Sequence, residues 1–140
     1  QPGHLIDFMA TFLEVAGAKY PKQMGDRKID PLMGKSLLPI LQGKKREGHE
    51  TMYFHFGTDR ALRQGKWKLV SAKLGRWELY DMESDRAEMN DLAKRHPDRV
   101  KTMAAKWFDL AKNTERLKGR HLNPVKPGLT KLNFRKDIFK

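Results

Sequence analysis

Arg60-Ala61-Leu62-Arg63-Gln64-Gly65-Lys66-Trp67-Lys68-Leu69-Val70 is the stretch that decides the fold class of this chain. Residues 51–56 precede it and residues 77–81 follow it, and these segments are rich in aromatic and β-branched side chains. The pairs Gln64-Gly65 and Leu74-Gly75 lie between the segments and are typical of tight turns. This pattern predicts an antiparallel meander of three or four strands.

A long helix is predicted over residues 97–117. Pro97 is tolerated in a first helical turn, and Asp98 favours the positive end of the helix dipole. The apolar positions form one stripe at helical spacing, namely Val100, Met103, Ala104, Trp107, Ala111 and Thr114. A shorter helix is expected from the polar turn at 84–88 up to Ala93. The expected class is therefore α+β, with a small antiparallel sheet of three to four strands packed against a long C-terminal helix.

The first fifty residues predict two further helices. One spans residues 5–16 and stops at Gly17. Its apolar side chains surround most of its circumference: Leu5, Ile6, Phe8, Met9, Phe12, Leu13 and Val15. Because such a helix needs burial on more than one side, we expect it to pack between this domain and another one. Residues 19–33 are predicted to be a loop, and residues 34–43 a short helix that Ser36 caps and Gly43 ends.

Composition limits the class of protein. A chain of 140 residues with 39% hydrophobic residues can build one modest core, so one domain is expected. No apolar run approaches the ~20 residues of a membrane span, and no membrane partner is expected. The start Gln1-Pro2-Gly3-His4 lacks the pattern of a signal peptide. The absence of cysteine excludes disulfides, thiolate catalysis and cysteine-based zinc sites.

The chain is strongly basic, with a net charge of +12. Residues 119–140 contain six basic residues and one acidic residue, and we expect them to form a basic extended tail beyond a domain of residues 1–118. A basic chain attracts polyanions such as sulfated polysaccharide or nucleic acid. One alternative function is therefore a free-standing module that binds a polyanion. The plainer interpretation is a protein with many surface lysines, which charge alone favours.

Several motifs resemble known chemical sites but lack residues that those sites require. Gly34-Lys35-Ser36 lacks the earlier glycine of a phosphate loop, because Ile29 stands there, and residues 81–85 lack the later ligands of a calcium loop. None of the five histidines has another at helical i, i+4 spacing, so zinc is not expected. His55 is the best single candidate for a polar group that faces a ligand. No arrangement of nucleophile and base is visible in the sequence.

Five segments, in order, resemble the C-terminal subdomain of type I sulfatases. Residues 4–11 and 13–17 are similar to the family's "H-x-I-D-x-x-P-T" helix and "L-x-x-A-G" stretch, and residues 34–43 to "G-x-S-L-L-P-L-L-x-G". Residues 60–70 are similar to "R-A-V-R-x-G-x-W-K-L", residues 77–81 to "W-E-L-Y-D", and residues 88–92 to "E-x-x-N-L". Three positions differ from the family pattern. Ala10 replaces the usual proline, and Asp91 replaces an asparagine. Residues 54–59 differ from the acidic segment with histidine and asparagine that many arylsulfatases have there.

The resemblance implies that the chain is the C-terminal part of an arylsulfatase-type enzyme that hydrolyses sulfate esters. The family's nucleophile is a formylglycine made from a "C/S-x-P-x-R" motif, and its calcium ligands lie in an N-terminal α/β domain. Ser36, Ser71 and Ser84 lack that motif, so no catalytic residue and no metal ligand is expected in this chain, which should be inactive alone. The candidates for the rim of the substrate cleft are His55, Asp59, Arg60 and Arg63.

The resemblance also implies partners. These are the catalytic domain of the same polypeptide, on which the helix within residues 1–17 would pack, and a sulfate-ester substrate. Nucleic acid is not the expected partner under this interpretation. A third alternative is a homo-oligomer in which exposed apolar helix faces pair between copies. Members of the family are usually periplasmic or secreted, and the same location is expected here.

Overall fold

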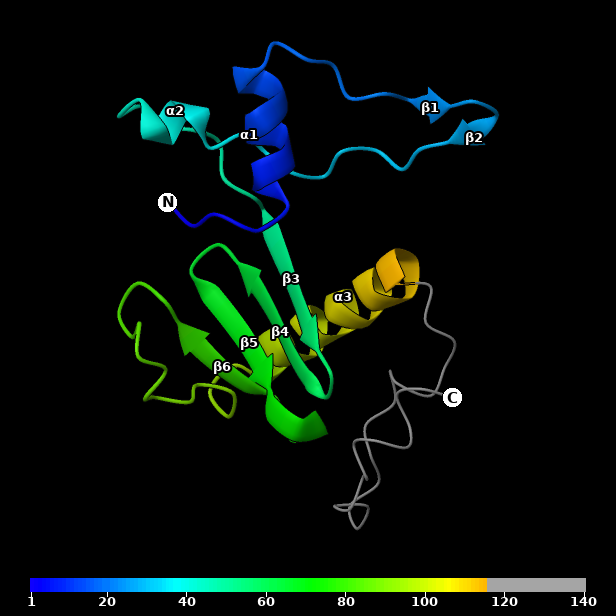
Figure 1. Ribbon diagram of the computed structural model, residues 1–140. Coiled ribbons are helices and arrows are strands. Elements are labelled where there is room, and N and C mark those ends of the chain that lie inside the picture. Colours follow the sequence, from blue (N-terminus) through cyan, green and yellow to red (C-terminus); the bar gives the residue numbers. More distant parts are fainter. Residues whose placement is uncertain (116–140) are drawn as a thin grey trace. The chain divides into compact units, whose positions relative to one another are not determined.

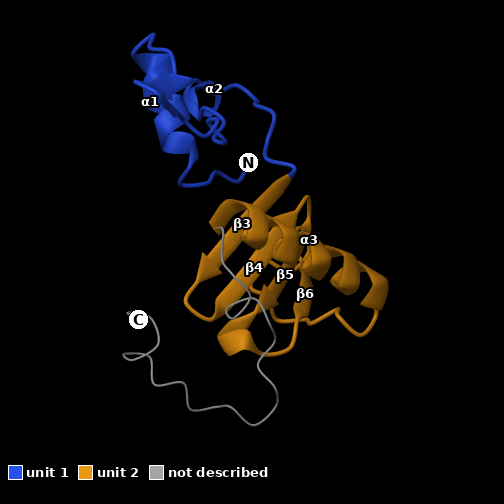
Figure 2. Ribbon diagram, turned by 90° about the vertical axis from the view of Figure 1, so that its right-hand side faces the viewer, with its two compact units in different colours: residues 1–50 blue, residues 51–140 orange. Residues whose placement is uncertain are grey.

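Residues 51–115 form a four-stranded antiparallel sheet with one long helix across a face of it. The computed structural model describes residues 1–115, and these divide into two compact units, residues 1–50 and the residues from 51 onward (Figure 2). The strands of the second unit are β3 (Thr51–Phe56), β4 (Asp59–Gln64), β5 (Trp67–Ser71) and β6 (Glu78–Asp81), in the order β3-β4-β5-β6. Helix α3 (Pro97–Glu115) lies across the sheet (Figure 1). The predicted α+β class and meander are confirmed.

Two hairpins set the register of the sheet. Gln64 pairs with Trp67, so β4 and β5 are joined by two residues, of which Gly65 has a φ of 56°. Phe56 pairs with Asp59, and Gly57 has a φ of 58° in that turn. Glycine adopts a positive φ without steric cost, which explains why the two tight turns occur there. The predicted turn at Gln64-Gly65 is confirmed.

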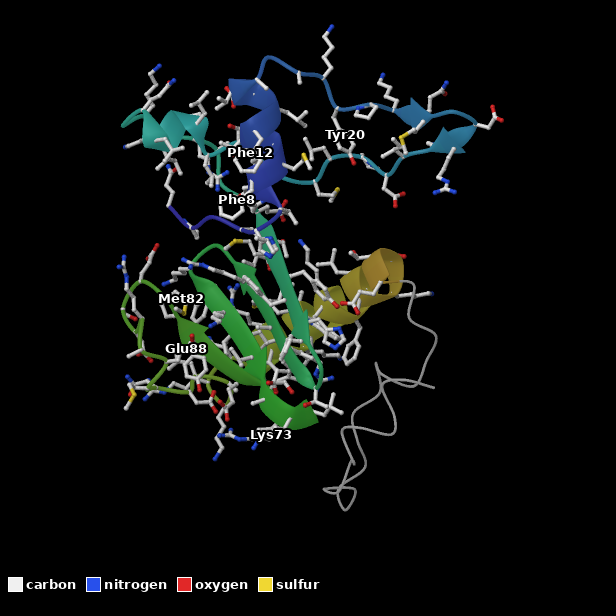
Figure 3. The ribbon with its side chains drawn as sticks, in the orientation of Figure 1. Phe8, Phe12, Tyr20, Lys73, Met82 and Glu88 are labelled. Atoms are coloured by element: carbon white, nitrogen blue, oxygen red, sulfur yellow. The ribbon has the colours of Figure 1, made fainter. Side chains whose placement is uncertain are left out.

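The predicted tight turn at Leu74-Gly75 is wrong. A 3₁₀ turn (Ala72–Leu74) connects β5 to β6 instead, and Lys73 and Leu74 both have a positive φ, of 51° and 56°. The turn is held by residues outside it, because the Leu74 amide donates a 2.9 Å hydrogen bond to the carbonyl of Thr58. Pairing with the β3–β4 turn therefore decides the conformation of this connector. Figure 3 labels Lys73 within it.

The core of the second unit lies between the sheet and α3. Its fully buried members are Leu62, Leu69, Leu79, Met103, Trp107 and Ala111. Burial of each large side chain contributes about 1.5–3 kcal/mol. The apolar stripe predicted for the helix supplies three of these residues, whereas Thr114 is exposed. The predicted end of the helix at residues 117–118 lies outside the described residues, as does the predicted tail 119–140.

The short helix predicted to follow the polar turn at 84–88 and to end at Ala93 does not form. Turns and bends occupy this segment, and Glu88 has a φ of 57°, which no right-handed helix contains. The carboxylate of Asp85 accepts hydrogen bonds from the amides of Met89 and Asn90. Aspartate side chains that bind nearby backbone amides compete with helix formation, and here that local alternative prevails.

The first unit contains two short helices and a small hairpin. Helix α1 (Asp7–Val15) and helix α2 (Leu38–Leu41) flank strands β1 (Gln23–Met24) and β2 (Arg27–Lys28). The prediction of an irregular loop over 19–33 is therefore wrong for the hairpin, which turns at Gly25 with a φ of 57°. α2 is shorter than the predicted 34–43, although Ser36 does accept the predicted hydrogen bond, from the amide of Leu38. None of the helices within residues 1–115 has the length and apolar character required to cross a bilayer.

Candidate functional site

Three of the four rim candidates, His55, Asp59 and Arg60, lie at or next to the turn between β3 and β4, whereas Arg63 lies near the other end of β4. Asp59 begins β4 and is exposed, and its Oδ1 atom accepts a 2.7 Å hydrogen bond from the amide of Lys73. This bond and the bond from Leu74 to Thr58 fasten the connector to the turn. The two loops thus form one surface feature at the same end of the sheet, defined by residues 57–59 and 72–75, which we call the paired-loop end.

Arg60 lies beneath this feature and is almost fully buried, with 2% of its surface exposed. Its Nη2 donates a 2.8 Å hydrogen bond to Oγ of Ser71, which in turn donates to the carbonyl of Gly75. Its Cζ lies 4.6 Å from the centre of the Trp77 ring and 5.5 Å from that of Trp107. Burial lowers the pKa of Arg60, and the aromatic faces offset part of that cost through cation–π attraction.

His55 lies on β3 directly opposite Arg60, because the two residues are register partners. Its Nδ1 is 2.8 Å and 2.9 Å from the two carboxylate oxygens of Glu115, and its ring meets Trp107 edge-on. The hydroxyl of Tyr53 donates to the same carboxylate. Burial, and then the hydrogen bond and negative charge of Glu115, raise the pKa of Tyr53 well above its usual range.

The four rim candidates do not converge on one surface. Register partners share a face of the sheet, so His55 and Arg60 belong to the face that α3 covers. Side chains alternate along a strand, which places Asp59 and Arg63 on the opposite face. Of these, Arg63 is half-buried and donates from Nε to the carbonyl of Gly65. The structure thus brings His55 and Arg60 together on the buried face, whereas Asp59 and Arg63 share the opposite face but lie four residues apart along β4.

A second polar cluster lies in the first unit and was missed from the sequence. The carboxylate of Asp7 is fully buried and accepts hydrogen bonds from the amides of His4 and Lys35, from Arg46 Nη2 at 3.0 Å and from His49 Nε2 at 2.6 Å. Burial alone would raise the pKa of Asp7, but these donors outweigh it and hold the pKa well below its usual range. The partners are 3 to 42 residues away from Asp7 in the sequence. The only sequence signal for this cluster is therefore an aspartate within a largely apolar helix.

The same cluster explains two of the segments that carry the family resemblance. Thr11 Oγ1 accepts a 2.9 Å hydrogen bond from the amide of Leu37, as Asp7 does from the amide of Lys35. Two side chains one helical turn apart on α1 therefore bind alternate amides of residues 35–37. Gly34 comes so close to α1 that a Cβ atom on it would lie 2.0 Å from the carbonyl oxygen of Ile6. Only glycine fits there.

Helix α1 buries its small and polar side and exposes its large apolar side. Its buried residues are Asp7, Ala10 and Thr11. Phe8 and Phe12 stack on each other with ring centres 6.3 Å apart and are 49% and 65% exposed (Figure 3). Met9 and Val15 of the helix are also exposed, as are Leu5 and Ile6 just before it. This is the reverse of an ordinary surface helix, and a group of exposed apolar side chains along one side of a helix is typical of a contact surface.

The described residues contain no group of three or more histidine, aspartate or glutamate side chains that could hold a metal ion. The donor set required for calcium is therefore not found within residues 1–115. The polar clusters around Asp7 and Arg60 contain cationic donors, which repel a metal cation rather than bind it.

Comparison with known proteins assigns the family. Residues 4–116 match the family described as "N-sulphoglucosamine sulphohydrolase, C-terminal". An uncharacterized sulfatase of Schizosaccharomyces pombe is 31% identical over 112 residues, which cover 74% of this chain and 20% of that protein. An N-acetylglucosamine-6-O-sulfatase of Bacteroides thetaiotaomicron is 28% identical over 101 residues, 62% of this chain and 17% of its own length. The chain belongs to this sulfohydrolase C-terminal family, and the resemblance stated from the sequence is confirmed.

Solved structures share the fold. The crystal structure of Ps i-CgsB superposes with a TM-score of 0.62 at 20% identity, over 86% of this chain and 27% of that one. The structure of BT4656 in complex with its substrate D-glucosamine-2-N,6-O-disulfate superposes with a TM-score of 0.56 at 23% identity. The match covers 80% of this chain and 24% of that one. The chain thus spans about a fifth of the curated relatives and about a quarter of these solved chains.

Proposed function

We propose that this chain is the C-terminal part of a sulfatase that hydrolyses sulfate esters. The observation that carries the proposal is the match of residues 4–116 to a C-terminal sulfohydrolase family. Two relatives that bear the name sulfatase support it. Sulfated sugars are the substrate class we propose, because one of these relatives is named for N-acetylglucosamine 6-O-sulfate and a structural neighbour binds a disulfated glucosamine. This substrate class is more specific than the arylsulfatase type that the sequence predicts.

The chemistry of the proposed enzyme resides outside this chain. The sequence has no cysteine, and none of its three serines stands in a "C/S-x-P-x-R" motif, so it cannot supply the formylglycine nucleophile of the family. The formylglycine and the calcium ion would come from an N-terminal α/β domain of the same polypeptide. The 140 residues alone should therefore have no sulfatase activity. Activity of the purified chain would refute the proposal that the catalytic residues lie in another domain.

The apolar side of α1 is the surface we propose for contact with that catalytic domain. Phe8, Phe12 and their apolar neighbours are exposed although α1 is anchored on its other side by Asp7 and Thr11. A catalytic domain is the expected occupant, because the solved relatives are about four times as long as the part that this chain matches. Burial of this patch would stabilise the contact by roughly 25 cal/mol per Å².

At the substrate cleft, we propose separate roles for the two pairs of rim candidates. Asp59 and Arg63 have polar atoms within reach of solvent and are the candidates for direct contact with substrate. The burial of Arg60 and the pairing of His55 with Glu115 favour a supporting role, in which they hold the paired-loop end in place. A guanidinium such as that of Arg63 suits a sulfate group because it offers donors in a fork.

The location that we propose is the periplasm or the exterior of the cell, on the grounds of the family resemblance. Cell fractionation with an antibody raised against residues 1–115 would test it. Recovery of the protein from the cytoplasm would refute this part of the proposal and leave the sulfatase assignment unaffected.

The decisive experiment is to sequence the gene upstream of Gln1 and to assay the whole product. We expect a "C/S-x-P-x-R" motif in an α/β context and release of sulfate from a sulfated amino sugar. A reading frame that starts near Gln1 would overturn the proposal. In that case the net charge of +12 would favour the polyanion-binding alternative, whose affinity for a sulfated polysaccharide should fall steeply with salt.

A further inference from the structure

Three buried polar atoms beneath α3 have no hydrogen-bond partner among the described residues. They are Nε2 of His55 and the Nε and Nη1 atoms of Arg60. A buried polar group without a partner costs about 1–3 kcal/mol, and more when the group is charged. Unpartnered atoms on two neighbouring side chains therefore point to a partner that the two side chains share.

The two side chains meet at the same place in the core. His55 and Arg60 are register partners on adjacent strands, so their Cβ atoms lie about 4.5–5.5 Å apart on one face of the sheet. Both contact the same indole: the His55 ring centre is 5.2 Å from that of Trp107, and Arg60 Cζ is 5.5 Å from it. The side chains that carry the unpartnered atoms thus both pack against Trp107.

The donors and acceptors of the region follow from the two side chains. Nδ1 of His55 faces two carboxylate oxygens, which only accept, so Nδ1 carries the hydrogen. In the neutral ring Nε2 is then an acceptor with nothing to accept. Arg60 has only donors. The negative charge of Glu115 and the positive charge of Arg60 already balance across the histidine, so no additional ion is required.

We propose that one buried water molecule bridges His55 and Arg60. It accepts a hydrogen bond from Nε or Nη1 of Arg60 and donates one to Nε2 of His55. Buried waters in proteins typically make about three hydrogen bonds to groups that would otherwise be unsatisfied, which is the situation here.

The bridge completes a polar chain across three strands. It runs from Glu115 to His55, through the water to Arg60, and on to Ser71 and the carbonyl of Gly75. One end is the last turn of α3 and the other is the connector of the paired-loop end. The bridge would therefore couple the position of the helix end to that of the loops. This inference does not depend on the sulfatase assignment.

Crystallography of the 140-residue chain tests the bridge directly. We expect an electron-density peak about 2.7–3.2 Å from Nε2 of His55 and from Nε or Nη1 of Arg60. Direct contact between the two side chains with no peak would overturn the proposal. A bromide soak separates water from an anion, because an anomalous peak at this position would show that the site binds halide.

Nitrogen-15 NMR tests the same point in solution. We expect His55 to carry its hydrogen on Nδ1 and to show the shift of an unprotonated nitrogen at Nε2, with cross-relaxation to a long-lived water. The opposite tautomer, or a ring protonated on both nitrogens at neutral pH, would overturn the proposal, because Nε2 could then not accept from water.

A double-mutant cycle measures the coupling. His55→Asn leaves an amide N–H near the position of Nδ1 and removes Nε2, and Arg60→Met removes the donors while it keeps the length of the side chain. We expect the two changes to be non-additive by on the order of tenfold in the unfolding equilibrium constant. As the control, His55→Asn combined with Ser84→Ala should be additive, because Ser84 is exposed. Additivity of the first pair would contradict the bridge, and if Arg60→Met does not fold, the two wild-type measurements decide.

Discussion

Arg46 donates a 3.0 Å hydrogen bond from Nη2 to Oδ2 of Asp7, and both side chains are shielded from solvent. The two residues are 39 positions apart in the chain. The same guanidinium also donates to the carbonyls of Lys35 and Pro2. One ion pair therefore joins the start of α1, the segment that contains Gly34 and the residues that lead to β3, and it is the main polar tie of the first unit.

Asp7→Asn should destabilise the first unit by about 3–5 kcal/mol, because it leaves the buried Arg46 without its counter-ion. The new amide would also direct N–H groups at existing donors. Chemical denaturation, followed by hydrogen exchange of residues 1–50, would measure the change. A loss below 1 kcal/mol would show that the ion pair is not the tie described above.

The stability of the first unit should fall in acid. The folded pKa of Asp7 lies below its ordinary value of about 3.9, so its ionised form stabilises the folded state above that pH. This contribution is lost as the pH falls below about 4 towards the folded value. Unfolding measured between pH 6 and pH 2 should show a steeper decline for the wild type than for Asp7→Asn. Parallel curves would contradict the assignment.

Gly34→Ala should prevent the normal docking of residues 34–37 on α1. The added Cβ would lie 2.0 Å from the backbone carbonyl of Ile6, which cannot move as a side chain could. A loss of about 1–3 kcal/mol or more is expected. Gly48→Ala is the matched control, since nothing lies within 4 Å of that position, and its thermal midpoint should be unchanged. Equal midpoints for the two variants would refute the close approach.

Ser71→Ala should weaken the support of the paired-loop end. It deprives Arg60 Nη2 of its acceptor and the Gly75 carbonyl of its donor, at a cost of about 1–3 kcal/mol. Ser84→Ala removes an exposed hydroxyl and should have almost no effect. Urea denaturation of the second unit compares the two. In the full-length sulfatase that we propose, we expect Ser71→Ala to raise KM more than it lowers kcat if the loops contact substrate.

Substitution of the exposed phenylalanines should change association and not folding. Phe8→Ser combined with Phe12→Ser removes the centre of the apolar patch on α1, and we expect a stability change within about 1 kcal/mol because both rings are largely exposed. Light scattering should show less self-association than in the wild type. Glu14→Gln, on the same helix, retains the patch and should behave as the wild type. An unchanged association state for the double variant would show that another surface is responsible.

Local patterns were sufficient for the elements that contact their sequence neighbours. The strand at residues 51–56 and the turn at Gln64-Gly65 were predicted as observed, because a high content of aromatic and β-branched residues and a glycine with positive φ are local properties. The predictions for 84–93 and Leu74-Gly75 failed where a distant or side-chain partner decides the backbone. Asp85 binds the amides of the first segment, and Thr58 binds the second.

The candidate site divides along the same line. The sequence identified its residues from their positions in a recognisable motif. It did not show which face of the sheet each side chain occupies. A shift of one position along β4 separates Asp59 from Arg60, and because strand residues alternate between faces, one is exposed and the other is buried under Trp107. The Asp7 cluster escaped notice altogether, since its partners come from segments up to 42 residues away.

The sequence by itself determined the α+β class, the meander, the helix that covers it and the family, because periodicity and motif order are written along the chain. Only the tertiary structure decided which charged groups are buried, that α1 turns its small polar side inward and its phenylalanines outward, and that Gly34 must be glycine. The physical reason is that burial and hydrogen bonding depend on which surfaces meet. Surfaces meet through contacts between segments that are remote in the chain, and no local pattern records them.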